Sequence, residues 1–364
     1  MTWPPVDPKP TGWSPSDPLV TPDQITRVKN AAIAAADGTL WTDVAQVNNI
    51  VTKTALTSSI GRFPIYDPAS GFFYSFSDDS TDPAGYRSRS GLSWYALTIP
   101  AGAGLTLGRA AMAVDGAGRI VFGGTPGSSS SQKYRSSLDG VGWTTRNSSF
   151  TNTAGVGVVL RAPSLGLFVS GLSSGAVETS PDGTTWTART TPNSDARDEG
   201  VVGLVGGSPL IILGGRLTTK IITSPDGVAW TERTPGIDSG NFCGSLFYSA
   251  TWSKFYLWSV QTPPVLYSSS DGVTWSSAGL GGLPGAVTPI VHTVVRGRLF
   301  VTLYDRAVSD VQFSWSIDGG VSWVHGDDLA ASGGVAGIAI SPGGQVCMTE
   351  TGGNHFTTLR GGYV

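Results

Sequence analysis

The chain has 364 residues, of which 40% are hydrophobic and only 13% charged, with a net charge of -3 and 50 glycines. The weakly acidic balance excludes the basic footprint of a nucleic-acid-binding protein. No segment reaches the roughly 18 consecutive apolar residues that a membrane-spanning helix needs. Many glycines between short apolar runs instead predict strands joined by turns. The two cysteines are too few for a disulfide framework.

The N-terminal region differs in composition from the rest. Residues 1–20 are rich in proline and predict an extended arm, which either stays disordered or docks against a partner. Residues 22–37 are rich in alanine and predict a short helix. We therefore expect 1–34 to be an attachment segment. It has neither the basic region nor the apolar stretch of a signal peptide, so we expect no export by that route.

A short motif repeats along the remaining chain. "SPDGTTW" (180–186) recurs as "SLDGVGW" (137–143), "SPDGVAW" (224–230), "SSDGVTW" (269–275) and "SIDGGVSW" (316–323), with a degenerate copy, "SRSGLSW" (88–94). The motif tryptophans are 43 to 49 residues apart. This period is typical of a four-stranded propeller blade.

The segments between the motifs predict the first two strands of each blade. Each contains two apolar runs separated by a tight polar turn, which is the pattern of a β-hairpin. A third strand then leads into each motif, and a fourth begins at its tryptophan. We predict an all-β fold, a seven-bladed propeller of four-stranded blades over 35–364, whose last blade is closed by an N-terminal strand at 35–46. The predicted hairpins cover 62–76, 111–124, 157–171, 201–215, 245–258, 290–303 and 337–350.

The motif residues fit a structural role. An aspartate in a turn accepts hydrogen bonds from nearby backbone N–H groups, the glycine after it permits a positive φ, and the tryptophan packs against a neighbouring sheet. A catalytic role is disfavoured because the copies would lie on different blades. The predicted structural residues are Ser137, Asp139, Trp143, Ser180, Asp182, Trp186, Ser224, Asp226, Trp230, Asp271, Trp275, Ser316, Asp318 and Trp323.

The motif resembles the Asp-box, or BNR repeat, of sialidase-type β-propellers, whose pattern is S-x-D-x-G-x-T-W. "SIDGGVSW" fits with Ser322 in the threonine place, and the other copies lack one residue between Asp and Gly. The resemblance covers about 61–326 and implies that the motifs lie in the hairpin between the third and fourth strands, away from an active site. The arginine–isoleucine–proline motif of sialidases is absent, since "GRFPIYD" (61–67) stands at its place. We therefore expect no catalytic residues, while a sialidase-like glycan hydrolase remains an alternative.

A ligand is expected on the opposite face, where the longer polar loops lie. The candidate ligand-binding residues are Arg197, Arg216, Tyr304, Asp305 and Arg306. The competing interpretation is a merely solvated rim. The three histidines have no ligand spacing, so we expect no metal, and we expect no cofactor.

The amino-acid composition, the proline-rich arm at 1–20 and the predicted ring of blades together resemble a bacteriophage virion protein of the tail, fibre or spike. We expect location in the virion, contact with other virion proteins through 1–34, and recognition of a host-surface glycan or protein by the propeller. Nucleic acid binding and membrane insertion are not expected, and a homo-oligomer is possible. The alternatives are the sialidase-like hydrolase and an Asp-box assembly factor that binds one protein partner.

Overall fold

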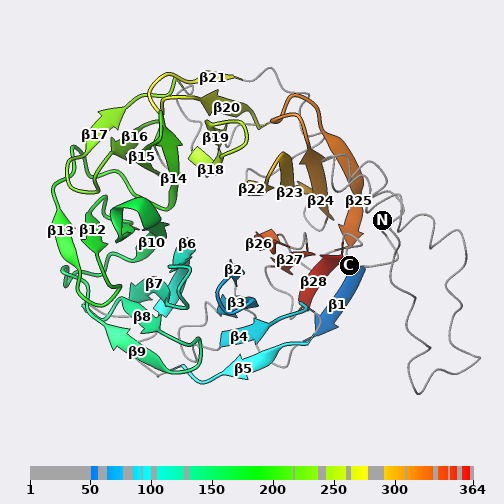
Figure 1. The fold of residues 1–364 in the computed structure, drawn as a ribbon, viewed down its shortest axis with the longest axis horizontal. Coiled ribbons are helices and arrows are strands. Elements are labelled where there is room, and N and C mark those ends of the chain that lie inside the picture. The colour runs from blue at the N-terminus through cyan, green and yellow to red at the C-terminus, as the bar shows by residue number, and fades with distance from the viewer. Residues whose placement is uncertain are drawn as a thin grey trace, which may run out of the picture.

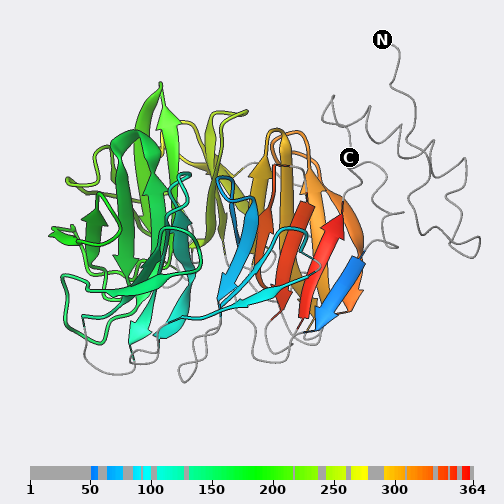
Figure 2. The same cartoon turned by 60° about the horizontal axis from the view of Figure 1, so that its bottom comes forward.

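The computed structural model describes residues 51–55, 64–76, 85–91, 93–99, 105–126, 131–215, 218–236, 243–259, 264–277, 291–307, 310–330, 335–342, 345–350 and 355–360. Within these ranges the fold is all-β, and the one helix is the 3-10 turn η2 (Pro163–Leu165). The sheets stand around a common centre, as in a β-propeller (Figure 1). Figure 2 shows the strands running between the two faces of the ring. The described part of the chain holds no helix with the length and apolar character that crossing a bilayer requires.

Five of the sheets have four strands each. One is β2 (Ile65–Asp67), β3 (Phe72–Phe76), β4 (Gly85–Ser88) and β5 (Tyr95–Leu97). The next is β14 (Glu199–Val205), β15 (Ser208–Gly214), β16 (Ile221–Ser224) and β17 (Thr231–Arg233). A third is β18 (Cys243–Ser249), β19 (Lys254–Ser259), β20 (Leu266–Ser269) and β21 (Ser276–Ser277). A fourth is β22 (Val291–Arg296), β23 (Leu299–Ala307), β24 (Asp310–Ser316) and β25 (Val324–Ala330). The fifth is β26 (Val335–Ile340), β27 (Gln345–Glu350), β28 (His355–Arg360) and β1 (Val51–Ala55).

The sixth sheet has eight strands in two antiparallel halves. The first half is β6 (Leu105–Val114), β7 (Ile120–Pro126), β8 (Tyr134–Ser137) and β9 (Trp143–Arg146). The second half is β10 (Val156–Ala162), β11 (Leu167–Leu172), β12 (Val177–Ser180) and β13 (Thr187–Arg189). The halves join where Val158 of β10 pairs in parallel with Ala110 of β6.

The prediction of seven separate four-stranded blades is therefore wrong, because the described strands form six sheets. The cause lies in β6, a ten-residue strand whose pairing with β7 shifts register between Leu107 and Met112. A register shift of this kind leaves backbone groups unpaired. Ala110, within the shifted stretch, pairs with Val158 instead. Each of the seven predicted hairpins does correspond to an antiparallel strand pair.

The sheet that contains the last strand is completed from the other end of the chain. β1 pairs antiparallel with β28, with Val51 opposite Leu359 and Ala55 opposite His355. The strand found there lies further along the chain than the predicted 35–46. That segment, the proline-rich arm and the expected helix lie outside the described residues.

The core lies between neighbouring sheets and is built largely from aromatic rings. Phe76 of β3 stacks on Phe122 of β7 with ring centroids 4.4 Å apart, and Trp143 packs edge-on against Phe76 at 5.0 Å. Tyr134 stacks on Trp186 at 4.1 Å across the junction of the eight-stranded sheet. The motif tryptophans thus bridge adjacent groups of strands, where burying their large apolar surface favours the folded ring.

Candidate functional site

The repeated Ser-x-Asp-Gly turns are closed by their own side chains. In the copy at 224–230, Oδ1 of Asp226 accepts hydrogen bonds from the backbone N–H groups of Val228 (2.8 Å) and Ala229 (2.9 Å). The Ser224 hydroxyl donates to the same oxygen at 3.0 Å and accepts from the Gly227 N–H at 2.8 Å. Gly227 has φ +74°, a left-handed conformation that favours glycine. The serine and aspartate side chains of this turn are therefore occupied within it.

The other copies share this arrangement. The serine hydroxyl lies 2.8–3.0 Å from the aspartate in all five full motifs. Backbone N–H donation lowers the pKa of the carboxyl groups of Asp139 and Asp226, and it lowers the pKa of Asp271 to about 2. The tryptophans of the first three copies are buried, and Trp275 and Trp323 are partly buried against the core. In these turns the aspartate carboxylate accepts hydrogen bonds from its own turn, which is the pattern of a structural residue.

The predicted ligand-binding residues do not gather into one exposed site. Arg197 is fully buried, and Arg216 lies outside the described residues. Tyr304, Asp305 and Arg306 belong to β23 and not to the loop that the sequence had predicted, because the β23–β24 hairpin continues as far as the pair Ala307–Asp310. The Tyr304 side chain is buried and its hydroxyl donates to Oε1 of Gln312.

Arg197 lies instead under a polar network at the start of β14. Its Nη2 donates to Oδ1 of Asn193. Its Nε and Nη1 are buried without a hydrogen-bond partner among the described residues. Burial lowers the pKa of the guanidinium, against the opposing effect of Asp195 and Glu232.

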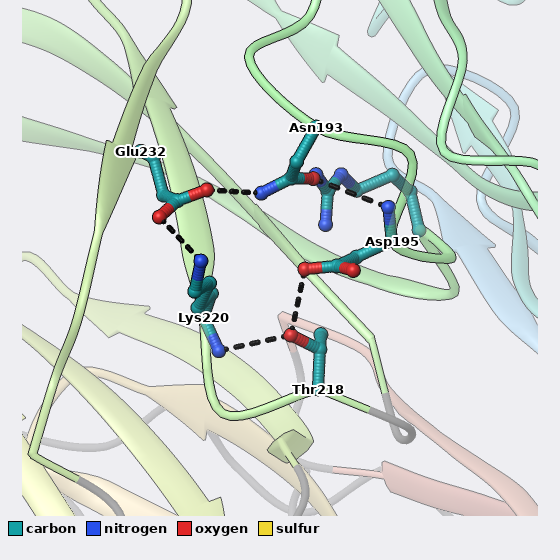
Figure 3. A network of polar contacts seen from close by, with 6 residues as sticks. Asn193, Asp195, Thr218, Lys220 and Glu232 are labelled. Carbon is teal, nitrogen blue, oxygen red and sulfur yellow. Dashed lines mark hydrogen bonds and ion pairs between the residues drawn. The ribbon is translucent and has the colours of Figure 1, made fainter.

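Figure 3 shows how the network extends from Asn193 and Asp195 to Thr218, Lys220 and Glu232 of the neighbouring sheet and the loop before it. Nδ2 of Asn193 donates to Oε2 of Glu232 at 2.6 Å, and Oε1 of Glu232 forms an ion pair with Nζ of Lys220 at 2.7 Å. Oγ1 of Thr218 donates to Oδ2 of Asp195 at 2.9 Å and accepts from the backbone N–H of Lys220 at 3.1 Å. The loop before β14 is thereby tied to the loop before β16. These residues were not among the predicted site residues, although Asn193 and Asp195 stand in the same polar loop as Arg197.

Four glycines make room for this loop. A Cβ atom at Gly157 would lie 2.2 Å from the backbone oxygen of Arg197, and one at Gly171 would lie 2.4 Å from the Arg197 Cβ. At Gly175 it would meet the backbone of Ser194 at 2.2 Å, and at Gly215 that of Ala196 at 2.0 Å. We call Gly157, Gly171, Gly175 and Gly215 the glycine seat. Any larger residue there would push the loop out of its place.

A second buried network surrounds Glu178 of β12. Oε1 accepts from the Tyr134 hydroxyl (2.6 Å) and the Ser148 hydroxyl (2.7 Å). Oε2 accepts from the backbone N–H (2.8 Å) and the hydroxyl (2.7 Å) of Ser149. Burial and the nearby Glu178 charge raise the pKa of Tyr134 well above its usual value. Both carboxylate oxygens are therefore saturated inside the fold.

The Tyr134–Glu178 pair is closed off from solvent. Here Tyr134 and Glu178 are both fully buried, and the Tyr134 ring is covered by Trp186. A substrate therefore has no access to this pair in the folded ring. Among the described residues there is also no group of three or more histidine, cysteine, aspartate or glutamate side chains placed to hold a metal ion.

Comparison with known proteins identifies the fold class. No family model matches the chain, and no curated protein does. Among solved structures, YCF48 bound to D1 peptide covers 85% of this chain and 94% of its own, with TM-score 0.60 and 12% identity. A catalytically inactive virginiamycin B lyase from Staphylococcus aureus with quinupristin covers 85% and 98%, with TM-score 0.64 and 10% identity. An ulvan lyase of a polysaccharide lyase family covers 84% and 95%, with TM-score 0.51 and 13% identity. At these identities the likeness shows the fold alone, and that fold is the β-propeller.

Proposed function

We propose that this chain is a binding propeller of a bacteriophage virion, which recognises a host-surface glycan or protein, and whose segment 1–34 attaches it to other virion proteins. The fold leaves this question open, because a peptide-bound protein and lyases share it. The virion setting is supported by the proline-rich N-terminal composition of the sequence. The repeated turn resembles the Asp-box, and this resemblance supports a structural role for the turn.

One observation carries the choice of binding over catalysis. The carboxylates of the two buried or linked networks, Glu178, Glu232 and Asp195, are all engaged in hydrogen bonds or ion pairs within the protein. Glycoside hydrolysis needs two carboxyl groups that flank an accessible bond. A rigid ring with its polar loops fixed by such contacts suits a preformed recognition surface.

The arm is tested by deleting residues 1–20 in the phage that encodes the chain. We expect the shortened protein to keep its cooperative unfolding transition and to be missing from purified particles. Particles that contain normal amounts of the shortened protein would exclude the attachment role.

Recognition is tested separately by competition. Purified full-length chain is expected to slow adsorption of particles to host cells, while the same protein unfolded by heat is not. Turnover of fluorogenic sialosides or host polysaccharide by the purified chain would instead support the hydrolase alternative. Stable co-purification with one host assembly protein, without effect on adsorption, would support the assembly-factor alternative.

A further inference from the structure

The turn at 88–94 departs from the other copies in two ways. Ser90 stands where the other turns have aspartate. In addition, the residue that precedes the first serine of the turn is Arg87, whereas four other copies have a hydroxyl residue there, Ser136, Thr179, Thr223 or Ser268. In the first three of these copies the hydroxyl oxygen accepts a hydrogen bond from Nε of an arginine on the following strand, which is Arg146, Arg189 or Arg233. The corresponding position after this turn is Leu97. In this copy the arginine therefore lies on the third strand of the sheet, at Arg87, and not on the fourth.

The changed turn borders a hollow of about 470 Å³, lined by Phe72, Arg87, Arg89, Ser90, Ser93 and Tyr95. Both guanidinium groups lie over the Phe72 ring, with Cζ of Arg87 4.8 Å and Cζ of Arg89 4.7 Å from its centroid. Tyr95, directly opposite Arg87 on the neighbouring strand, is 63% exposed. The hollow thus combines two cations, two aromatic rings and two serines.

Among the described residues that line this hollow, none carries a carboxylate. The part of the chain that the structure describes also records no ion pair or hydrogen bond from the side chain of Arg87 or Arg89. Two like charges held close together repel each other, and an anion bound between them removes that cost. Guanidinium groups match carboxylate geometry because they donate two parallel hydrogen bonds.

A comparable hollow at another turn shows what is special here. It has about 280 Å³ and is also lined by two arginines, Arg119 and Arg146, but Asp139 lines it as well. Nη1 of Arg119 donates to the backbone oxygen of Asp182, and Nε of Arg146 donates to Ser136. Arg119 and Arg146 therefore form hydrogen bonds within the protein. The described side-chain contact of Arg87 and Arg89 is instead the Phe72 ring.

We propose that the hollow at Phe72, Arg87, Arg89 and Tyr95 binds an acidic saccharide through a carboxylate of the sugar. The two guanidinium groups hold the carboxylate, the exposed Tyr95 ring offers a stacking surface for the sugar, and the hydroxyls of Ser90 and Ser93 face its polar edge. The site lies beside a repeated turn, on the face opposite the polar loops. It goes beyond the proposed function, because it depends neither on attachment to a particle nor on the loop-face residues.

The test is calorimetric titration of the full chain with a hyaluronan hexasaccharide, which carries glucuronate carboxylates, and with a neutral chitin hexasaccharide. We expect saturable binding of the first that weakens with added salt, and none of the second. Arg87→Ala and Arg89→Ala are each expected to weaken binding by roughly tenfold or more, the effect of losing a charge-assisted hydrogen bond. Tyr95→Ala is expected to weaken it as well.

Arg189→Ala is the matched control, because it removes the same charge beside a turn that keeps its aspartate. We expect its affinity to equal that of the parent protein. Arg89→Gln serves if an alanine variant fails to unfold cooperatively. Equal affinity for the neutral sugar, no binding of either sugar to the folded chain, or unchanged affinity in the arginine variants would overturn the site. Inorganic phosphate that binds as tightly as the hexasaccharide would overturn the saccharide assignment. None of these results bears on particle attachment or adsorption, which are measured separately.

Discussion

The Tyr134 hydroxyl donates a 2.6 Å hydrogen bond to Glu178 Oε1, and this bond joins the two halves of the eight-stranded sheet. Lys133, next to Tyr134 and also buried, donates to the backbone oxygens of Asn152 (2.6 Å) and Ala154 (2.5 Å). A buried carboxylate is tolerated only when its hydrogen-bonding capacity is filled. The contact between the two halves of the sheet therefore depends on the buried Glu178 carboxylate and its hydrogen bonds.

We predict that Glu178→Ala lowers the free energy of unfolding by about 3–5 kcal/mol, the usual cost of removing one member of a buried charged network. Tyr134→Phe should cost about 1–2 kcal/mol, because the carboxylate keeps its other donors. Urea unfolding followed by tryptophan fluorescence measures both. A Glu178→Ala variant as stable as the parent would show that the network contributes nothing to the fold.

The repeated turns should make stability depend on acid pH. The backbone N–H groups of Thr274 and Val273 lower the pKa of Asp271 to about 2 in the folded protein, against about 3.9 for an unperturbed aspartate. A lowered folded pKa stabilises the protein above the unfolded value, and that contribution is lost as pH falls through the folded value. Asp271→Asn should therefore be less stable than the parent at pH 7.

The difference should shrink as the pH falls from about 4 to about 2, since the asparagine variant has no charge to lose there. Parallel denaturant titrations of the two proteins across this range provide the measurement. A gap between the parent and Asp271→Asn that stays constant with pH would contradict the assigned role of the charged carboxylate.

The glycine seat should reject even one methyl group. Gly157→Ala places a Cβ atom 2.2 Å from the backbone oxygen of Arg197, so the loop must move, at a cost of about 1–3 kcal/mol. Gly142→Ala is the control, because its Cβ would meet nothing nearer than the Asp139 carboxylate at 3.8 Å. Thermal unfolding distinguishes them. Equal melting temperatures for the two variants would mean that the loop accommodates the methyl group freely.

The thiol of Cys347 should be inert in the folded protein. It is fully buried in β27, and burial raises its pKa far above that of an exposed cysteine. Since the thiolate is the reactive form, we expect no reaction with a disulfide reagent until the protein unfolds. A Cys243→Ser background isolates this thiol, and rapid labelling of the native protein would show that the sheet opens readily.

Much of the fold could be predicted from the sequence, because its signals are local. Paired apolar runs and the Ser-x-Asp-Gly motif each lie within about 15 residues and determine hairpins and turns directly. The pairing of Val158 with Ala110 could not be predicted, because it depends on a register shift in β6 that leaves no mark in the residue pattern.

The candidate site was harder to predict for a similar reason. Arg197 stands in a polar loop and was expected to be exposed. Because the residues of the glycine seat have no side chain, that loop packs closely against them and Arg197 is buried. Glycines from separate strands contribute no side-chain pattern that would reveal such a seat in advance. For Tyr304 a signal did exist: Val311 and Phe313 resume the strand pattern after a short interruption, which is typical of a longer hairpin rather than a loop.

The pairing of β1 with β28 has a mechanical consequence. The two strands lie side by side (Figure 1), and Val51, where the chain enters β1, pairs with Leu359, close to where it leaves β28. A pull applied across these two points would load the ladder from one end. Its rungs would then break in succession, as in a zipper, instead of resisting together in shear. The ring would open first at this seam under tension, while the stacked aromatic rings elsewhere still hold.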